Sequence, residues 1–229
     1  MDSRGEKQFI KFPKVAAKLY DYMISGYSTK AQTNEIAQYL ASRINNGKLL
    51  DVGTGPGRLL IAINQFNPNI ELYGLDISES MIKQAKENLS NVSVDLRLGN
   101  IMKTEYKDNF FDIIASTGSF YLWDNPENCI EEIGRILNAN GSVYIFETYK
   151  DHNKSDYKNT LKQNLKKENI PRRLFAPYFL NKQLNMTYKF QEIESIVNNT
   201  SFKNSYTINK IKLGGLPIWL RIELKKHSA

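Results

Sequence analysis

The amino-acid sequence predicts an α/β fold in which a mostly parallel sheet carries helices on both faces. Between residues 48 and 147, apolar runs of strand length alternate with stretches whose apolar residues recur every three or four positions. Such alternation is typical of a parallel sheet whose strands are linked by helices. The last two strand-like runs are joined by residues 213–217 alone. They must be antiparallel, because a parallel crossover needs about a dozen residues or more.

The first elements expected are helical. Apolar residues recur at helical spacing over residues 13–44, with a break at residues 25–28. Gly47 follows as a glycine that can end the second helix. We therefore expect residues 13–46 to form a helical lid that precedes the sheet.

Strands and helices then alternate. The strands are expected at residues 48–52, 71–75, 93–98, 111–115 and 142–147. The helices are expected at residues 58–66, 80–89 and 126–137. A turn over residues 138–141 is expected to separate the third helix from the fifth strand, because Asn and Gly favour turns.

The pattern changes after Glu147. Residues 148–189 are expected to form a cap or lid inserted after the fifth strand. A helix at residues 190–198 and strands at residues 205–212 and 218–225 are expected to close the chain. The length suits one α/β domain, so residues 1–229 are expected to form a single domain.

Composition restricts the class of protein. The sequence has no run of about 18 apolar residues, so we expect no transmembrane helix, and its polar N-terminus indicates no signal peptide. Cys129 is the only cysteine, which excludes a disulfide framework and favours a cytoplasmic location. The net charge of +7 permits contact with nucleic acid or an anionic surface but does not require it.

The first strand ends in a tight turn that contains Gly53, Gly55 and Gly57. Glycine lets the backbone adopt conformations closed to other residues and lets a ligand come close. The turn also directs backbone N–H groups and the positive end of a helix dipole above the strand. Dinucleotide-binding folds use the spacing Gly-x-Gly-x-x-Gly, but Arg58 stands where their third glycine is needed. The spacing therefore disfavours a nicotinamide cofactor.

The pattern Asp51-x-Gly53-x-Gly55-x-Gly57 resembles the first motif of class I S-adenosylmethionine-dependent methyltransferases. The resemblance implies that Gly53, Thr54, Gly55 and Gly57 hold the methionine end of this cofactor. Its carboxylate would meet backbone amides, and Asp51 would attract its ammonium group, directly or through water.

Further motifs follow in the family's order. Asp76 ends the second strand, where a carboxylate can accept hydrogen bonds from both ribose hydroxyls, as it also does in dehydrogenases. By resemblance, Ile77 belongs to this site and Met81 packs near the adenine, although Met81 fits a plain core position equally well. Asn100, followed by Ile101, stands where family members often carry an aspartate that accepts from the adenine. Its amide oxygen can accept that bond or hold its own turn.

The end of the fourth strand completes the resemblance. Ser116, Thr117 and Ser119 would face the sulfonium and the methyl group. Tyr121 and Trp123 either belong to this wall or simply pack. The resemblance covers roughly residues 19–147 and implies a Rossmann-like, seven-stranded sheet in the order 3-2-1-4-5-7-6 with an antiparallel last strand.

The insertion after the fifth strand carries two rows of residues at helical spacing. The basic row consists of Lys154, Lys158, Lys162 and Lys166, and the apolar row of Tyr157, Leu161 and Leu165. The basic row is either a solvated face or a site for an acidic substrate, a nucleic acid or a membrane surface. A later run is either a lid over an apolar acceptor or the core of the cap. That run contains Phe175, Pro177, Tyr178 and Phe179.

Methyl transfer depends largely on alignment, and it needs a base only when the acceptor carries a proton. His152, just after the fifth strand, is the predicted base, although a histidine on a polar loop is often only solvated. Tyr20 and Tyr27 in the lid are predicted to orient the acceptor. Cys129 is expected in the core, and the sequence shows no cluster of metal ligands.

The leading hypothesis is an S-adenosylmethionine-dependent methyltransferase that acts on a small molecule by in-line displacement at the carboxyl edge of the sheet. The alternative is a methyltransferase for RNA or another macromolecule that uses the basic row. A NAD-dependent oxidoreductase and a non-catalytic cofactor-binding protein rank lower. We expect no stable nucleic-acid complex and no membrane contact. The acceptor, its reacting atom and the oligomeric state, monomer or dimer, are left open.

Overall fold

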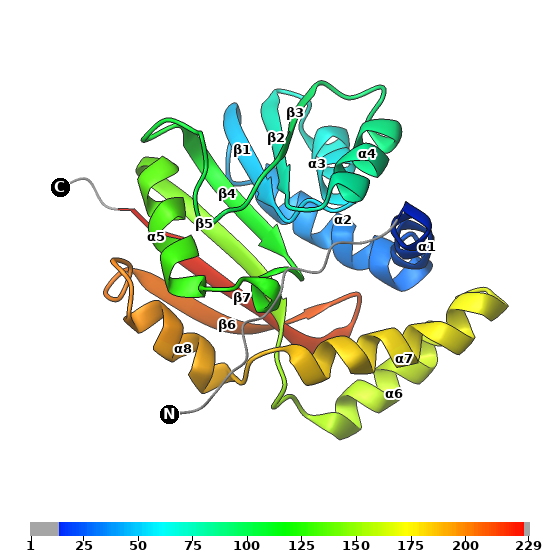
Figure 1. Ribbon diagram of the computed structural model, residues 1–229. Helices are drawn as coiled ribbons and strands as arrows, with labels where there is room; N and C mark the ends of the chain where they lie inside the picture. Colours follow the sequence, from blue (N-terminus) through cyan, green and yellow to red (C-terminus); the bar gives the residue numbers. More distant parts are fainter. Residues whose placement is uncertain (1–13, 227–229) are drawn as a thin grey trace.

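The computed structural model describes residues 14–226, so Pro13, the predicted start of the first helix, lies outside the described residues. The strands are β1 (Gly47–Val52), β2 (Ile70–Asp76), β3 (Val94–Leu98), β4 (Phe111–Thr117), β5 (Leu137–Thr148), β6 (Tyr206–Leu213) and β7 (Leu216–Lys225). They form one sheet in the order β3-β2-β1-β4-β5-β7-β6 (Figure 1). The first five pair in parallel, whereas β7 is antiparallel to both β5 and β6. The predicted fold class, strand order and antiparallel last strand are confirmed.

Helices cover both faces of the sheet. They are α1 (Lys14–Ile24), α2 (Tyr27–Ala41), α3 (Arg58–Phe66), α4 (Glu79–Asn88), η1 (Phe120–Leu122, a 3-10 helix), α5 (Pro126–Ile136), α6 (Lys154–Leu165), α7 (Ile170–Met186) and α8 (Phe190–Asn198). On one face, Ile130 of α5 and Ile193 of α8 are fully buried in the same core cluster as Ile114 of β4. On the other, Leu40 of α2 and Leu60 of α3 are fully buried in a second cluster.

Local sequence explains where α5 begins and which side it buries. The Asn125 side chain caps the helix by accepting a hydrogen bond from the amide of Asn128, and Pro126 occupies the first turn. Cys129 and Ile133 lie on the buried side of the helix and have no exposed surface. The expected core position of Cys129 is therefore confirmed.

The predicted turn over residues 138–141 is wrong as a boundary, because β5 begins at Leu137 and continues through it. Asn140 adopts a left-handed φ of 64°, which asparagine tolerates better than most residues, and its amide donates to the carbonyl of Lys226. The pairing of β4 with β5 shifts register between Phe111 and Ile113. The extra residues are thus absorbed as an irregular stretch inside the strand.

The insertion is a helical hairpin made of α6 and α7, which lie side by side below the sheet (Figure 1). The Tyr157 hydroxyl of α6 donates to the Asn181 side chain of α7 at 3.2 Å. Tyr157 is buried and Leu161 is partly buried against the core, as expected of the apolar row. Phe175 and Tyr178 are exposed, so they do not form the core of the cap.

Candidate functional site

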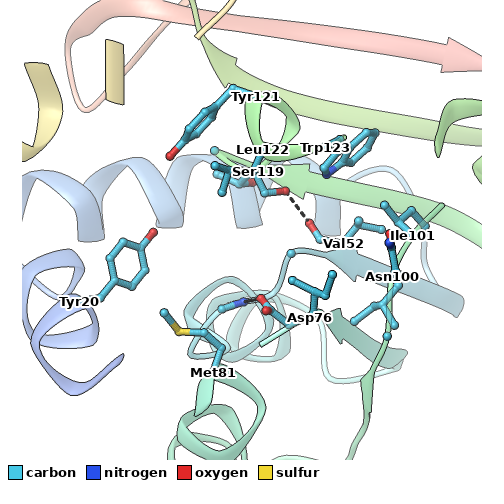
Figure 2. A pocket seen from close by; sticks show the side chains of 17 residues that line it. Tyr20, Val52, Asp76, Met81, Asn100, Ile101, Ser119, Tyr121, Leu122 and Trp123 are labelled. Atoms are coloured by element: carbon cyan, nitrogen blue, oxygen red, sulfur yellow. Dashed lines mark hydrogen bonds between the residues drawn. The ribbon is translucent and has the colours of Figure 1, made fainter. Parts of the chain in front are cut away.

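A cavity lies beyond the carboxyl ends of β1, β2 and β4, where the strand order reverses (Figure 2). The predicted site residues that line it are Tyr20, Gly53, Gly55, Asp76, Ile77, Met81, Asn100, Ile101, Thr117 and Ser119. The other lining residues are Val52, Leu75, Gly99, Gly118, Tyr121, Leu122 and Trp123. Residues far apart in the chain therefore meet at one point, and Tyr121 and Trp123 belong to the wall.

The glycine turn offers space to a ligand rather than free donors. The amides of Gly53 and Thr54 both donate to the carbonyl of Leu75, at 2.8 and 3.1 Å, and the amide of Gly57 donates to Thr54. The amide of Gly55 donates to the Asp76 carboxylate. These four amides were expected to be free to bind the carboxylate of the cofactor. They are instead hydrogen-bonded within the protein, where they stabilise the turn. Gly55 has a φ of +53° and open space where a Cβ would stand.

Asp76 connects the turn to the second strand. One carboxylate oxygen accepts from the amide of Gly55 and the other from the amide of Ser78, each at 2.8 Å. Burial raises the pKa of Asp76, and these amide hydrogen bonds oppose the rise. The amide of Ile77 is a further donor to this carboxylate, which lines the cavity and keeps acceptor capacity beyond these three amides. The predicted contact of Asp76 with a cis-diol stays a prediction.

Four of the predicted cofactor-binding residues lie outside the lining: Asp51, Thr54, Gly57 and Ser116. Burial raises the pKa of Asp51 to about 7, and the Thr54 hydroxyl acts in the opposite direction. Gly57 has a φ of +79°, and its backbone packs closely against Leu89, which a Cβ would strike. These residues lie in or next to the turn but do not line the cavity. Their direct contacts with a cofactor stay predictions.

Ser119 joins the loop after β4 to the first strand. Its hydroxyl donates to the carbonyl of Val52 at 3.1 Å and shares a 2.7 Å hydrogen bond with the buried hydroxyl of Ser116. A Cβ on Gly53 would lie 2.5 Å from the Ser119 hydroxyl oxygen. Glycine at position 53 is therefore needed for this close approach, and Ser119 is held at the cavity wall.

The residues predicted to lie near the adenine hold local structure and also line the cavity, and their contact with an adenine stays a prediction. The Asn100 side-chain oxygen accepts from the amide of Met102 at 2.9 Å, so Asn100 holds its own turn and keeps one lone pair on that oxygen. Met81 and Ile101 are only 3% and 5% exposed, yet both line the cavity. Met81 and Ile101 therefore belong both to the core and to the apolar wall of the cavity.

An ion pair that the sequence did not reveal anchors α1 beside the cavity. Arg58, at the start of α3, forms two hydrogen bonds with the Asp21 carboxylate of α1, at 2.7 and 2.8 Å. Asn88 of α4 donates to the same carboxylate and to the carbonyl of Pro56 in the glycine turn. Arg58, which takes the place of a third glycine, thus links the start of α3 to α1. Because Tyr20 is adjacent to Asp21 in α1, this ion pair also positions Tyr20 at the cavity.

The structure does not bring the other two predicted catalytic residues to the cavity. The ring nitrogen Nδ1 of His152 is hydrogen-bonded to the carbonyl oxygen of Tyr149 at 2.8 Å, and the ring packs edge-on against Tyr157 of α6. Tyr27 is 51% exposed and accepts a hydrogen bond from Lys167. Their catalytic roles stay predictions that the geometry does not support.

Glu147, which the sequence did not single out as a site residue, is a fully buried carboxylate at the end of β5. It accepts from the amide of Tyr121 at 3.2 Å and from the amide of Thr148 at 2.8 Å. Burial raises its pKa to about 7. Loss of water around the hydroxyl, together with the charges of Asp76 and Glu147, raises the pKa of Tyr20, although the residue as a whole is 41% exposed. Burial, together with the charge of Glu147, raises the pKa of Tyr121.

The buried carboxyl of Glu147 predicts a loss of stability as pH rises. In the unfolded chain Glu147 deprotonates near its ordinary pKa of 4.5, whereas in the folded protein it keeps its proton until about pH 7. Between these values the folded state binds more protons, so the free energy of unfolding falls with pH. Glu147→Gln lacks this titrating group. Between pH 5 and 7.5, we therefore expect its free energy of unfolding, measured with urea, to fall by about 2 kcal/mol less than that of the wild type. Parallel pH profiles for the two proteins would contradict this assignment.

Comparison with known proteins points to one family. The family model described as a methyltransferase domain matches residues 44–200. The demethylmenaquinone methyltransferase of Bacillus cytotoxicus is 32% identical over 155 residues. That match covers 64% of this chain and 64% of the relative, so the chain spans less than two thirds of that relative's length.

Solved structures share the fold across nearly the whole chain. A putative S-adenosyl-L-methionine-dependent methyltransferase from Methanococcus maripaludis superposes with a TM-score of 0.73 at 22% identity, covering 100% of this chain and 98% of that one. The plantazolicin methyltransferase BamL, solved with a triazolic desmethylPZN analog and SAH, gives a TM-score of 0.69 at 17% identity over 93% and 91% of the two chains. Within residues 14–226, none of the helices has the length and hydrophobicity to span a bilayer.

Proposed function

The chain belongs to the methyltransferase-domain family of S-adenosylmethionine-dependent enzymes, and from this premise we propose that it methylates a small molecule held between α1 and the loop after β4. When bound, the cofactor supplies an activated methyl group for in-line displacement by an acceptor atom. The protein's part is to bind both molecules, align them and exclude water.

The residues of the cavity fit this cofactor. Gly55 leaves open space beside the backbone, and the Asp76 carboxylate retains acceptor capacity for a ribose. Met81, Ile101 and Trp123 provide apolar surface for a ring. We propose that Asp76 holds the ribose and that these apolar side chains flank the adenine. Thr117 and Ser119 would lie beside the reacting group.

The position of Tyr20 carries the proposal of a small acceptor. Figure 2 shows the hydroxyls of Tyr20 and Tyr121 directed toward one another from opposite sides of the cavity. The Asp21–Arg58 ion pair fastens α1, so the Tyr20 ring stays over the cavity. An acceptor that fits between two such rings is a small molecule with an apolar or aromatic body.

The two tyrosines would orient the acceptor rather than remove its proton. A tyrosine hydroxyl already keeps its proton at neutral pH, and the raised pKa of Tyr20 and Tyr121 strengthens this, so neither side chain would act as a base. No histidine is among the described residues that line the cavity. This arrangement suits an acceptor that is already nucleophilic at the working pH, for which alignment is sufficient.

Methyl-labelled S-adenosylmethionine tests the size of the acceptor. The enzyme and labelled cofactor would be incubated with an extract of the source cells, and the label would be separated into low-mass, solvent-extractable and acid-precipitable fractions. We expect label in the low-mass or solvent-extractable fraction, and none there with Tyr20→Ala. Label confined to acid-precipitable RNA or protein would overturn the proposal and support the macromolecular alternative.

A further inference from the structure

The outer side of α7 exposes an unusual amount of apolar surface. Five large side chains in its first three turns, named here the α7 apolar face, are between 46% and 72% exposed: Ile170, Leu174, Phe175, Tyr178 and Phe179. Their spacing places them together on one broad side of the helix. Soluble proteins rarely expose a contiguous patch of this kind unless it binds something.

The opposite side of α7 is already occupied. Leu184 is only 5% exposed, and Leu180 packs against the core. Figure 1 shows α6 and α7 reaching out together past the edge of the sheet. The α7 apolar face therefore has no partner among the described residues that would explain its composition.

The neighbouring helix adds a basic row to this surface. Lys154, Lys158 and Lys162 of α6 and Lys166, which directly follows it, are all exposed, while Tyr157 on the inner side is buried. The lysines and the α7 apolar face are thus both exposed on the same helical hairpin. Residues 154–186 hold eight basic and two acidic side chains, a net charge of +6 in a chain of net charge +7.

We propose that the outer surface of the α6–α7 hairpin docks on an anionic lipid bilayer. The α7 apolar face would enter the boundary between head groups and acyl chains, and the α6 lysines would contact anionic head groups. This inference replaces the expectation of no membrane contact and requires no membrane-spanning helix. It interprets the basic row as a binding surface rather than a solvated face.

Charge and apolarity together favour this occupant over two others. A second copy of the chain, docked through the same surface, would bring two lysine rows together and repel. A nucleic acid would match the lysines but would leave five large apolar side chains without a partner. A bilayer with anionic lipid matches both rows at once.

Docking would also explain how an acceptor enters. The Gln183 amide nitrogen of α7 would lie 3.6 Å from a Cβ on Gly118, which lines the cavity. Phe179 and Phe175 lie about one and two turns before Gln183 on the same side of the helix. This row leads from the docked surface to the cavity. The consequence, which rests on the proposed function, is that the acceptor is a lipid-soluble small molecule.

Vesicle sedimentation tests the docking surface directly. The full chain would be centrifuged with phosphatidylcholine vesicles, with or without phosphatidylglycerol, at low and high salt. We expect it to sediment with the anionic vesicles only, and less at high salt. The double variant Ile170→Glu/Leu174→Glu should bind these vesicles at least about tenfold more weakly, because it places charge in the apolar face. Phe66→Glu, at an exposed apolar residue of α3, is the control for a negative charge added elsewhere on the surface and should bind like the wild type.

The outcomes separate docking from the proposed function. Binding of S-adenosylhomocysteine by every variant would show that each one folds. No sedimentation with anionic vesicles, or unchanged sedimentation of the double variant, would overturn the docking inference. So would a dimer that the double variant converts to a monomer in light scattering. Methyl label found only in RNA or protein would instead overturn the proposed function and leave the docking result intact.

Discussion

Asp76→Ala is expected to weaken binding of S-adenosylhomocysteine by about 100-fold or more. The carboxylate would accept two charge-assisted hydrogen bonds from the ribose, and each is worth about 1.5–3 kcal/mol, where 1.4 kcal/mol corresponds to tenfold in affinity. The same carboxylate also holds the amides of Gly55 and Ser78. Its removal therefore loosens the turn as well as the contact. Isothermal titration calorimetry measures the change.

Asp95→Ala is the matched control for this loss. Asp95 lies on the adjacent strand β3 and pairs with Arg97 at 2.8 Å on the surface, so its removal changes the charge equally without touching the cavity. We expect Asp95→Ala to bind S-adenosylhomocysteine as the wild type does. If Asp76→Ala kept wild-type affinity, the ribose would not be held by Asp76, and the placement of the cofactor would be wrong.

Gly55→Val is expected to reduce cofactor affinity by up to about 100-fold while the protein still folds. The new side chain would enter open space, because no atom lies within 4 Å of the position of its Cβ. That space is the part of the cavity into which we place the cofactor. The backbone φ of +53° makes valine unfavourable, at about 1–3 kcal/mol of stability. Thermal unfolding and calorimetry would measure the two effects separately.

Gly215→Val separates backbone strain from obstruction. Gly215 lies in the turn between β6 and β7 with a φ of +77°, and a Cβ there makes only an ordinary 3.5 Å contact with Thr160. The two variants should lose similar stability, but only Gly55→Val should lose affinity. Equal affinity of both variants for S-adenosylhomocysteine would show that the space beside Gly55 is not used.

Local patterns were sufficient to predict most of the sheet. The strict alternation of apolar runs and helical spacing identified β1 to β5, and the short connection at residues 213–217 required the antiparallel pairing of β7. The start of β5 was mispredicted for a long-range reason. Asn140 joins a strand rather than a turn because its amide meets Lys226, which lies at the far end of the chain. Spacing along the sequence carries no information about such a partner.

The site residues show the same difference between features set by local sequence and features set by long-range contacts. Asp76 and Gly55 were predicted from a motif whose residues are close in sequence, and both line the cavity. Glu147 was missed because its importance comes from burial, and the Asp21–Arg58 ion pair was missed because it joins distant helices. His152 was assigned from its place after β5, but its side chain packs on α6, which no local pattern could indicate.

A crystal structure of the protein with S-adenosylhomocysteine tests the central claim most directly. The account predicts that the ribose hydroxyls bind the Asp76 carboxylate, that the ligand passes beside Gly55, and that its sulfur lies near Ser119, below the space between Tyr20 and Tyr121. A ligand bound away from the carboxyl ends of β1, β2 and β4, or with its ribose away from Asp76, would contradict the account.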